Sequence, residues 1–524
     1  WDIGVTAAWQ GDLVYQQAGV VGDQVEFDDT AAGTTRVVLA DDQLAPLLIL
    51  VDNQTKNYEF TGAGALTGSG GLTKKGSGTL TLANTGDNTF GGPVNLEGGV
   101  LRQDGLADRL PTNAVVTLAN AGGVTLDLNG FDLQLGSLSG GGAVNLGAGN
   151  LSLGAGGGNF AGVISGSGAL IKNTAGTQTL SGANTYSGGT VVANSSLVVV
   201  NSTGSGLGSG PVTIGPGGIL QLGNGVVEGH IDATEIYNDG RLNLFPATDQ
   251  TFTKTVTGAG VLAKMLGNGT TLVFNHANDY AGGTIIYQGT VLAAHPEALG
   301  TGPITVGNWT ATDTMLAVSG DITLTNAIVL SGKTGALVPS PVGVNNVFDP
   351  TTYQAGTNTL SGPITLAGAT CWAVGSDAGL LIVNGGLVNN QNGPLCQFFL
   401  RGSAEGVWNS ALKDASTANR LMLEKTDAGT WTVASTNTFT GRTLVSDGKL
   451  ILTGALNGSS NVVVKSGATL AGTGWITGAV TNSGTIDLSD DDVLRPLTVN
   501  GVYLMDYLAT VKLSVGPEGN DSIG

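Results

Sequence analysis

Few residues in this chain of 524 residues have side chains capable of catalysis or metal binding, and they are scattered. The three histidines, His230, His276 and His295, are too few and too widely separated to suggest a zinc site, whose ligands usually come in closely spaced pairs. The signatures of a zinc-protease helix, a nucleophilic serine elbow and a phosphate-binding loop are missing. We therefore expect no catalytic residue, no metal ligand and no cofactor.

The run Asp490-Asp491-Asp492 is a group of carboxylates that could bind calcium. Calcium loops usually alternate their ligands with other residues, whereas these three aspartates are contiguous. A solvated acidic turn therefore fits the run better, and calcium binding by acidic turns stays open.

Charges of both signs occur together with a tryptophan only between residues 401 and 427. An enzyme that cleaves polysaccharides would need such a group of acids and bases on one face. Residues 404–416 also have the most helix-like composition of the chain. We interpret 401–420 as an insertion that projects from the fold, and 339–358, which opens with Pro339-Ser-Pro341, as a second loop.

Another group of residues is repeated four times at fixed spacing. A leucine, a lysine and a second apolar residue lie at offsets 0, +2 and +10, and an Asn-x-aromatic-x-Gly segment follows. The repeated residues are Leu72, Lys74, Leu82, Phe90 and Gly92; Leu170, Lys172, Leu180, Tyr186 and Gly188; Leu262, Lys264, Leu272, Tyr280 and Gly282; and Leu423, Lys425, Val433, Phe439 and Gly441. Self-similarity of this kind indicates a repeat architecture.

The repeated positions suggest structural roles. We expect the four lysines to lie near turns on a solvated face. The four aromatic residues recur too sparsely for a sugar-binding stripe, and we expect them to fill corners of the core.

Composition and local pattern predict an all-β fold. Glycine accounts for 87 residues and charged residues for only 11%, while the hydrophobic fraction is 41%. Short runs such as Thr79-Leu-Thr-Leu82 alternate apolar and polar residues, and glycine-rich pairs separate them. Strands this short cannot stand alone, so we predict a β-solenoid in which each coil pairs with the coils above and below. The spacing of the repeats fits coils of roughly 20–25 residues.

Charge and hydropathy exclude some partners. The net charge is −19, with 20 basic and 39 acidic residues and no basic stripe, so binding to nucleic acid is not expected. No apolar run reaches the length of a membrane span. Cys371 and Cys396 are one coil length apart in sequence, and stacked positions lie about 4.8 Å apart, so we predict that they form a disulfide.

Three segments resemble a known family. The units GSGGLTKKGSGTLTL, GSGALIKNTAGTQTLSGANTYSGGT and GAGVLAKMLGNGTTLVF are similar to the autotransporter-associated β-strand repeat, also called the passenger-associated transport repeat. The segment from Gly472 to Ile486 resembles the family's closing pattern. The resemblance implies a single right-handed parallel β-helix, exported and displayed at the surface of a bacterial cell. It implies no particular activity.

The repeats define the expected organisation of the chain. Residues 1–61 are interpreted as leader or cap coils, 62–165 as repeat 1, 166–257 as repeat 2, 258–420 as repeat 3 with its two insertions, and 421–524 as repeat 4 with the C-terminal coils. Because the chain stops at Gly524 within a further coil pattern, we expect a truncated or processed end.

We therefore predict a secreted structural or adhesive protein of the bacterial surface that is not an enzyme. Self-association into filaments is expected, and a surface polysaccharide or the surface of a host or neighbouring cell is a possible partner. The alternative is a polysaccharide lyase or hydrolase on the same scaffold, since fold alone does not decide function.

Overall fold

The computed structural model describes residues 1–19, 21–265, 269–307, 314–331, 342–346, 356–368, 371–391, 394–489 and 497–513, with backbone alone for 342–346 and 371. These residues form short strands joined by turns, and they include no helix. Among them there is accordingly no helix that could cross a membrane. The all-β prediction is confirmed.

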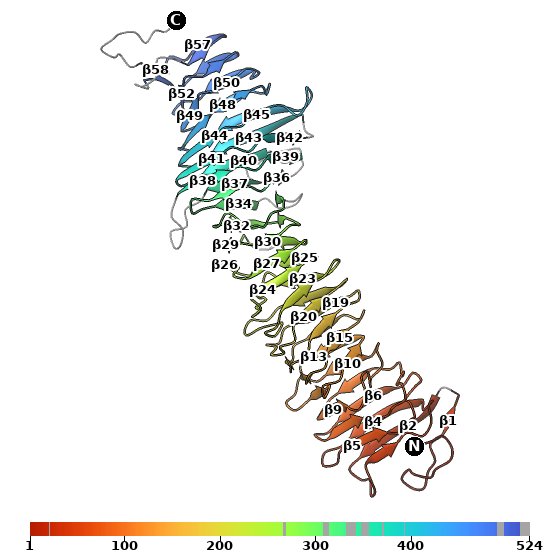
Figure 1. Cartoon of the computed structure of the whole chain (residues 1–524). Coiled ribbons are helices and arrows are strands. Elements are labelled where there is room, and N and C mark those ends of the chain that lie inside the picture. Colours follow the sequence, from red (N-terminus) through yellow and green to blue (C-terminus); the bar gives the residue numbers. More distant parts are fainter. Residues whose placement is uncertain are drawn as a thin grey trace. The chain divides into compact units, whose positions relative to one another are not determined.

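The chain divides into two compact units. Unit 1 comprises Trp1–Ala247 and Val256–Gly260, and unit 2 comprises Thr248–Thr255 and Val261–Gly524. Within each unit the strands stack coil upon coil (Figure 1).

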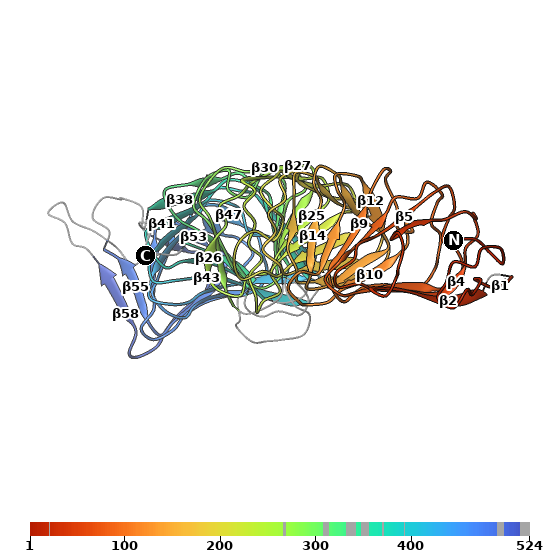
Figure 2. The same ribbon diagram turned by 90° about the horizontal axis from the view of Figure 1, so that it is seen from below.

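Unit 1 contains three sheets. The first consists of β1 (Gln17–Ala18), β2 (Val21–Asp28), β4 (Pro46–Asp52), β6 (Gly71–Lys75), β8 (Val94–Leu96), β10 (Val115–Leu118), β13 (Ser137–Gly140), β16 (Gly158–Phe160), β19 (Thr177–Leu180), β21 (Ser196–Val199), β23 (Ile219–Leu222) and β25 (Arg241–Leu244). The second consists of β3 (Arg36–Val38), β5 (Tyr58–Thr61), β7 (Thr79–Leu82), β9 (Val100–Gln103), β11 (Thr125–Asp127), β14 (Ala143–Asn145) and β17 (Ile164–Ser165). The third consists of β12 (Leu133–Leu135), β15 (Leu151–Leu153), β18 (Leu170–Lys172), β20 (Thr190–Val192), β22 (Val212–Ile214), β24 (Glu235–Asn238) and β27 (Thr255–Gly258). Figure 2 shows β2, β4 and β10 along one side and β5 and β9 along the other.

Unit 2 contains four sheets. The first consists of β28 (Val261–Lys264), β31 (Thr284–Ile286), β33 (Ile304–Val306), β36 (Ile328–Ser331), β39 (Ile364–Gly368) and β42 (Leu387–Gln391). The second consists of β26 (Gln250–Thr251), β29 (Thr271–Phe274), β32 (Gly289–Ala293), β34 (Thr314–Val318), β37 (Val342–Asn346), β40 (Cys371–Ser376), β43 (Leu395–Arg401), β45 (Arg420–Lys425), β48 (Thr443–Val445), β51 (Asn461–Val464), β54 (Ala479–Asn482) and β57 (Tyr503–Met505). The third consists of β35 (Thr323–Leu324), β38 (Thr357–Leu360), β41 (Leu380–Val383), β44 (Glu405–Trp408), β46 (Thr430–Val433), β49 (Lys449–Leu452), β52 (Thr469–Gly472), β55 (Thr485–Leu488) and β58 (Thr510–Leu513). The fourth consists of β47 (Thr436–Asn437), β50 (Ala455–Leu456), β53 (Trp475–Ile476) and β56 (Thr498–Val499), and the short strand β30 covers Asp279–Tyr280.

The register shows that these sheets form a solenoid. Leu72 of β6 lies opposite Ile49 of β4 and Val94 of β8, which are 23 residues before it and 22 residues after it. Strand pairs between coils are parallel, and the antiparallel pairing of β1 with β2 is at the N-terminal part of unit 1. A strand therefore finds its partner one coil away along the chain, as the β-solenoid prediction requires.

The interior of each coil is filled by alternate residues of its short strands. In β7, Leu80 and Leu82 are buried while Thr79 and Thr81 face outward. The same alternation repeats in most strands, so rows of aliphatic side chains stack along the inside of each unit. At the N-terminal coils the interior is aromatic, with Trp1, Trp9 and Phe27 in mutual contact.

The expected insertion at 401–420 is wrong. Its residues 405–408 form β44, which pairs in parallel with β41 and β46, and Trp408 and Leu412 are fully buried. The composition looked helical because the alternation Glu-Gly-Val-Trp is short and the following turn is polar. The segment is one coil of the stack rather than a projection from it.

The other expected loop, 339–358, is only partly described. Its residues 342–346 form β37, which pairs with β34 and β40, and residues 357–358 begin β38. These parts therefore belong to the stack, and residues 339–341 and 347–355 lie outside the described residues.

Glycine ends the repeated Asn-x-aromatic-x-Gly segment because the backbones of adjacent coils approach closely there. A Cβ atom on Gly92 would lie 2.4 Å from the backbone of Gly70, and one on Gly188 would lie 2.4 Å from Gly168. The Gly92 N–H also donates to the Gly70 carbonyl over 3.0 Å. No side chain fits without separating two hydrogen-bonded coils.

We therefore expect Gly92→Ala to destabilise the protein by roughly 1–3 kcal/mol, the usual cost of overpacking a close contact. The measurement is the midpoint of urea unfolding. Gly91→Ala is the matched control, because the nearest atom to its added Cβ is 3.7 Å away. Equal midpoints for the two variants would contradict the close-approach explanation.

Candidate functional site

The four repeated lysines are buried, which corrects the expectation of a solvated face. Lys74, Lys172, Lys264 and Lys425 are each 0% exposed. They point inward because they lie two residues after a buried leucine, and residues two apart in a strand share a face. The two-residue spacing from leucine to lysine is visible in the sequence and indicates an inward lysine. We predicted a solvated face because lysine usually lies at the surface.

Each buried ammonium group is held by backbone carbonyl groups at a corner of the coil. Lys74 Nζ donates to the carbonyl of Gly76 over 2.9 Å, to that of Gly98 over 3.2 Å, and to that of Lys75. Gly98 belongs to the next coil, 24 residues later. An ammonium has three N–H donors, so one side chain satisfies three carbonyl groups that would otherwise be buried without partners.

Two other copies make the same contact with the following coil. Lys264 Nζ donates to the carbonyl of Gln288 over 2.8 Å, and Lys425 Nζ donates to that of Asp447 over 3.3 Å. Each copy has a further apolar residue nine positions after the glycine of its Asn-x-aromatic-x-Gly segment, at Leu101, Leu197, Val291 and Leu450. Gly98, Gln288 and Asp447 each lie three residues before this repeated apolar position. We call this arrangement of a lysine and its carbonyl acceptors the lysine corner.

The second copy differs in the direction of its contact. Lys172 Nζ donates to the carbonyl of Gly154, 18 residues earlier, over 2.9 Å and also to that of Thr174. The corresponding position in its next coil is Asn194, whose φ of 44° is in the left-handed region, while Ser195 Oγ donates to the Lys172 carbonyl over 2.8 Å. This corner therefore joins its coil to the preceding one through the lysine side chain.

Burial lowers the pKa of these lysines, since desolvation penalises the charged form. The pKa is lowered to about 8 for Lys74, Lys264 and Lys425, and it is also lowered for Lys172. Nearby carboxylates oppose this effect, for example Asp52 beside Lys74. At neutral pH the first three remain protonated. The ammonium groups of Lys74 and Lys425 each have three carbonyl acceptors, and that of Lys264 donates to the Gln288 carbonyl and to Thr270 Oγ1.

The repeated asparagines connect three successive coils. Asn88 Oδ1 accepts from the Leu66 N–H over 2.9 Å, and its Nδ2 donates to the Arg109 carbonyl over 2.8 Å. The equivalent pairs are Ile164 and Gly206 at Asn184, and Leu412 and Ala455 at Asn437. A side-chain amide offers one acceptor and two donors, which is what a corner between two neighbouring coils requires.

The repeated aromatic residues fill the core, as predicted. Phe90 and Phe439 are at most 2% exposed, and Tyr186 and Tyr280 are fully buried. The two tyrosine hydroxyls each meet a threonine hydroxyl four residues later at 2.6 Å, at Thr190 and Thr284. After Phe90 the same position is Val94. Each buried hydroxyl thus has a partner, and the phenylalanine of the first copy needs none.

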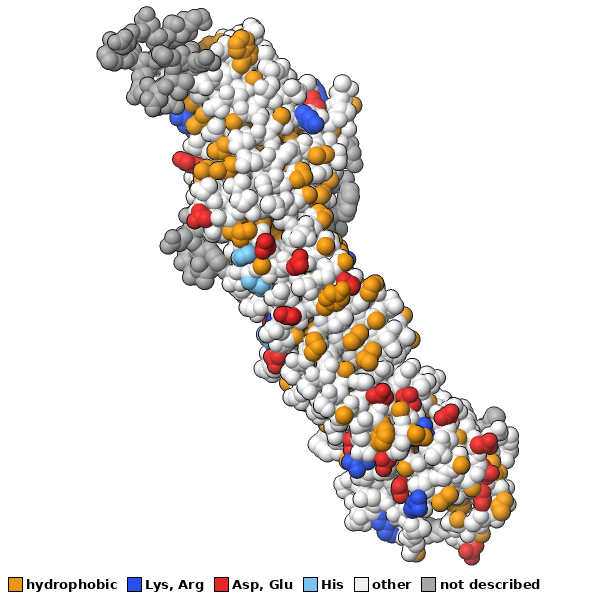
Figure 3. Space-filling model, in the orientation of Figure 1, with side chains coloured by type: hydrophobic (Ala, Val, Ile, Leu, Met, Phe, Trp, Pro, Cys, Tyr) orange, Lys and Arg blue, Asp and Glu red, His pale blue; other side chains and the backbone are white. Residues whose placement is uncertain are grey.

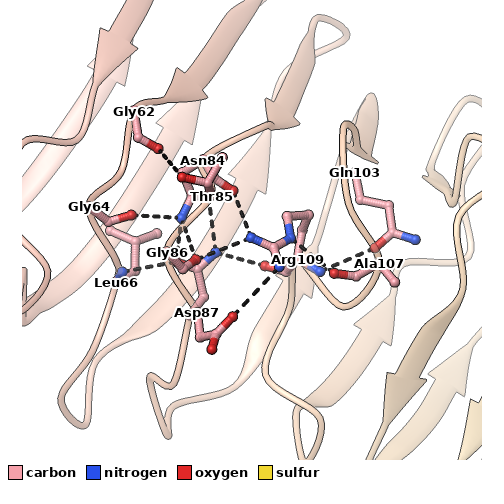
Figure 4. Close-up of polar contacts among 11 residues, drawn as sticks. Gly62, Gly64, Leu66, Asn84, Thr85, Gly86, Asp87, Gln103, Ala107 and Arg109 are labelled. Carbon is pink, nitrogen blue, oxygen red and sulfur yellow. Dashed lines mark hydrogen bonds and ion pairs between the residues drawn. The ribbon is translucent and has the colours of Figure 1, made fainter.

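A buried arginine forms a further corner that the sequence reasoning missed. Arg109 Nη1 donates to the carbonyls of Asn84 over 2.7 Å and Gly86 over 3.2 Å, and its Nε donates to that of Ala107 (Figure 4). Asn88 and Gln103 complete this network between coils. The network uses its polar atoms on the fold itself, so it supplies no reacting group.

The mixed charges between 401 and 427 also have structural contacts. Arg401 Nε lies 3.9 Å from Asp427 Oδ2, and Lys425 is a lysine corner. Trp408 and Trp431 are fully buried, and Trp431 donates to the Arg401 carbonyl. Trp408 and Lys425 therefore face the interior, whereas Glu405, Lys413 and Arg420 are exposed.

The remaining candidates are not brought together. Within the described residues there is no group of three or more histidine, cysteine, aspartate or glutamate side chains that could hold a metal ion. Asp490–Asp492 lie outside those residues. Cys371 is in register with Gln397 and Cys396 with Leu421, one residue out of step with stacking, and the disulfide stays a prediction.

Comparison with known proteins identifies the repeated element. The family model of the passenger-associated-transport-repeat matches residues 72–102, 170–199, 267–293 and 423–452, and confirms the resemblance. Three matches start at Leu72, Leu170 and Leu423, the leucine two residues before a corner lysine, and all four end just past the next repeated apolar position. Each match is therefore longer than one coil and contains the asparagine and the glycine of a coil junction. Three matches also contain the corner lysine, while the third begins after Lys264.

One curated relative is the Adhesin BmaC autotransporter of Brucella suis biovar 1 (strain 1330), which is 28% identical over 456 residues. The alignment covers 78% of this chain and 13% of that protein, so the chain spans a small part of its relative's length. No solved structure matches the chain.

Replacing a corner lysine by methionine keeps its length but removes its donors. We expect Lys74→Met to lower the free energy of unfolding by about 1–3 kcal/mol, because buried carbonyl groups lose their partners. Urea unfolding measures the effect. The neighbouring Lys75 faces outward and pairs with Glu97 over 3.6 Å, so Lys75→Met is the control and should change stability by less than about 1 kcal/mol. A larger loss for Lys75→Met would refute the corner role.

The corner lysines also predict a pH dependence. Between about pH 8, the lowered pKa of Lys74, Lys264 and Lys425, and the ordinary value of 10.5, the unfolded chain binds more protons than the folded one. Their contribution to the free energy of unfolding should therefore rise with pH from 8 to 10. The difference between wild type and Lys74→Met, measured across that window, isolates the contribution of one corner. An unchanged difference would show that the Lys74 pKa is not lowered by folding.

Proposed function

We propose, from the four passenger-associated-transport repeats that this chain carries, that it is a stretch of an extracellular adhesive β-solenoid displayed at a bacterial surface. The observation that carries this proposal is that the matches cover the coil junctions: three contain the corner lysine, and the remaining one, 267–293, contains Gln288, whose carbonyl Lys264 contacts. The matched sequence is the part of each repeat that joins one coil to another, so the repeats build a scaffold rather than a reaction centre.

The relative supports binding rather than catalysis. Its name describes an adhesin, and it aligns with 78% of this chain. Of the residues around 401–427 that suggested a polysaccharide-cleaving enzyme, Trp408 and Lys425 are buried, and Arg401 pairs with Asp427. We therefore favour adhesion over the enzyme alternative.

Self-association into filaments is the finer part of the proposal. Parallel strands at the end of a stack carry backbone groups that can pair with another chain. A head-to-tail contact of that kind does not close and would propagate. The net charge of −19 opposes close packing of copies at low ionic strength, so assembly should increase with salt.

Adhesion is tested with the purified chain coupled to fluorescent beads. Beads carrying it should be retained on bacterial or animal cell layers above the level of beads carrying an unrelated acidic protein. Retention at the control level on every cell type would contradict the proposed function.

Light scattering at increasing protein concentration tests assembly separately. We expect the average mass to rise above that of the 52.3 kDa chain, and to rise further with salt. A single species of that mass at all concentrations would exclude the filament while leaving adhesion intact.

A further inference from the structure

The first sheet of unit 1 carries two leucines on its outer face. In β4 the core residue Ile49 lies between Leu48 and Leu50, which therefore point outward and are only half-buried. The residues in register with Leu50 on the next two strands of the sheet are polar, Thr73 and Asn95. The leucines thus depart from the usual pattern of the sheet, and they leave apolar surface in contact with solvent.

Carboxylates border this pair of leucines. The register places Glu26 of β2 beside Leu50, and it places Asp28 of β2 beside Asp52 of β4. Two like charges directly opposite each other in a sheet are unfavourable. We call the outward residues Glu26, Asp28, Leu48, Leu50 and Asp52 the leucine–carboxylate face.

The nearby lysines do not neutralise these carboxylates. In the described part of the chain, none of the three forms an ion pair with a lysine or an arginine. Lys75 is in register with Asp52, but its Nζ lies 3.6 Å from Glu97 Oε2. The ammonium group of Lys74 is buried, and its three donors are used by backbone carbonyls. The carboxylates can therefore pair with a cation from outside the chain.

The rest of the N-terminal coils has the same character. Residues 1–61 contain ten acidic and two basic residues, so negative charge is concentrated there. Val21 and Leu47, at the start of β2 and β4, are 46% and 58% exposed. Figure 3 shows acidic and hydrophobic side chains interspersed on the N-terminal coils. A partner that matches this surface has to be both basic and apolar.

We propose that the leucine–carboxylate face binds a basic amphipathic segment of another protein. The apolar side chains of the segment cover Leu48 and Leu50, and its lysines or arginines pair with the carboxylates around them. Nucleic acid and anionic lipid carry the same sign of charge as the face and are repelled. A metal ion alone would leave the leucines uncovered. This inference goes beyond the proposed function, since it does not require attachment to a cell.

Fluorescence anisotropy with the full chain tests the proposal. The probe is a labelled amphipathic helical peptide of about 18 residues, made of leucine and lysine. A serine–lysine peptide of the same length keeps the charge, and a leucine–glutamate peptide keeps the apolar side chains.

We expect the leucine–lysine peptide to bind about tenfold more tightly than the serine–lysine peptide, and its binding to weaken with salt. The leucine–glutamate peptide should not bind. Absence of binding by the leucine–lysine peptide, or equal affinity for the two basic peptides, would overturn the proposal.

Variants locate the contact. Leu50→Thr removes apolar surface but keeps a good strand former, and it should weaken binding of the leucine–lysine peptide about tenfold. Glu26→Gln removes one charge from the face and should weaken binding about threefold. Glu235→Gln removes the same charge from an exposed position on β24 of the third sheet, and it should bind as wild type.

Circular dichroism confirms that these variants fold. Equal affinities of the Glu26→Gln and Glu235→Gln variants, or wild-type affinity of Leu50→Thr, would show that the peptide binds elsewhere and would overturn the leucine–carboxylate face as its site.

The outcome is separable from that of the proposed function. If Leu50→Thr loses the peptide while its beads adhere to cells as wild type does, the face stands and adhesion uses another surface. If wild type binds no peptide but its beads adhere, adhesion stands and the proposal fails. If Leu50→Thr abolishes self-association in light scattering while no peptide binds, the face contacts a second copy and the proposal is wrong.

Discussion

The structure depends on satisfying backbone carbonyl groups at the corners of narrow coils. Along the strands, each N–H and C=O pairs with the coil above or below, but a corner turns the chain away from its neighbours and leaves carbonyls pointing inward. At four coil junctions, the ammonium group of a corner lysine donates hydrogen bonds to these carbonyl groups. Burial of a charge is costly, and it is tolerated here because every N–H of the Lys74 ammonium has a carbonyl acceptor.

Other residues satisfy the backbone groups of the corners in different ways. They are the corner asparagines, Arg109, and glycines such as Gly92 at which two backbones approach closely. Asn88 joins three coils through one amide, and Arg109 spreads its donors over carbonyls of two coils. Gly92 removes the side chain altogether so that two backbones can bond directly. A chain with few charged residues thus places several of them inside, where their number of donors matters more than their charge.

Much of the fold followed from the sequence because its signals are local and repeated. The alternation in Thr79–Leu82 and the recurrence of Leu72 and Lys74 at fixed offsets require nothing beyond strand geometry and repetition. The inward direction of the lysines was also implied by their even offset from a buried leucine. The assignment of 401–420 failed because a single coil with Trp408 inside has too few alternating residues to be told from an irregular segment. The Arg109 network could not be found from sequence, since it exists only through contacts between coils that are 25 and 23 residues apart along the chain.

The lysine corners also bear on how the chain selects one alignment of its coils. Coils built from glycine, threonine and leucine resemble one another, and a slip by one residue would exchange the inner and outer faces of a strand. At Lys425 such a slip would move the ammonium outside and strand the carbonyls of Thr426 and Asp427 in the interior. A slip that turns an aliphatic side chain outward loses its hydrophobic burial, whereas a slip at a corner also leaves carbonyl groups without the lysine donors. We therefore expect the four lysines to fix the register of their own coils, and so to limit the alternative alignments of the uniform coils between them.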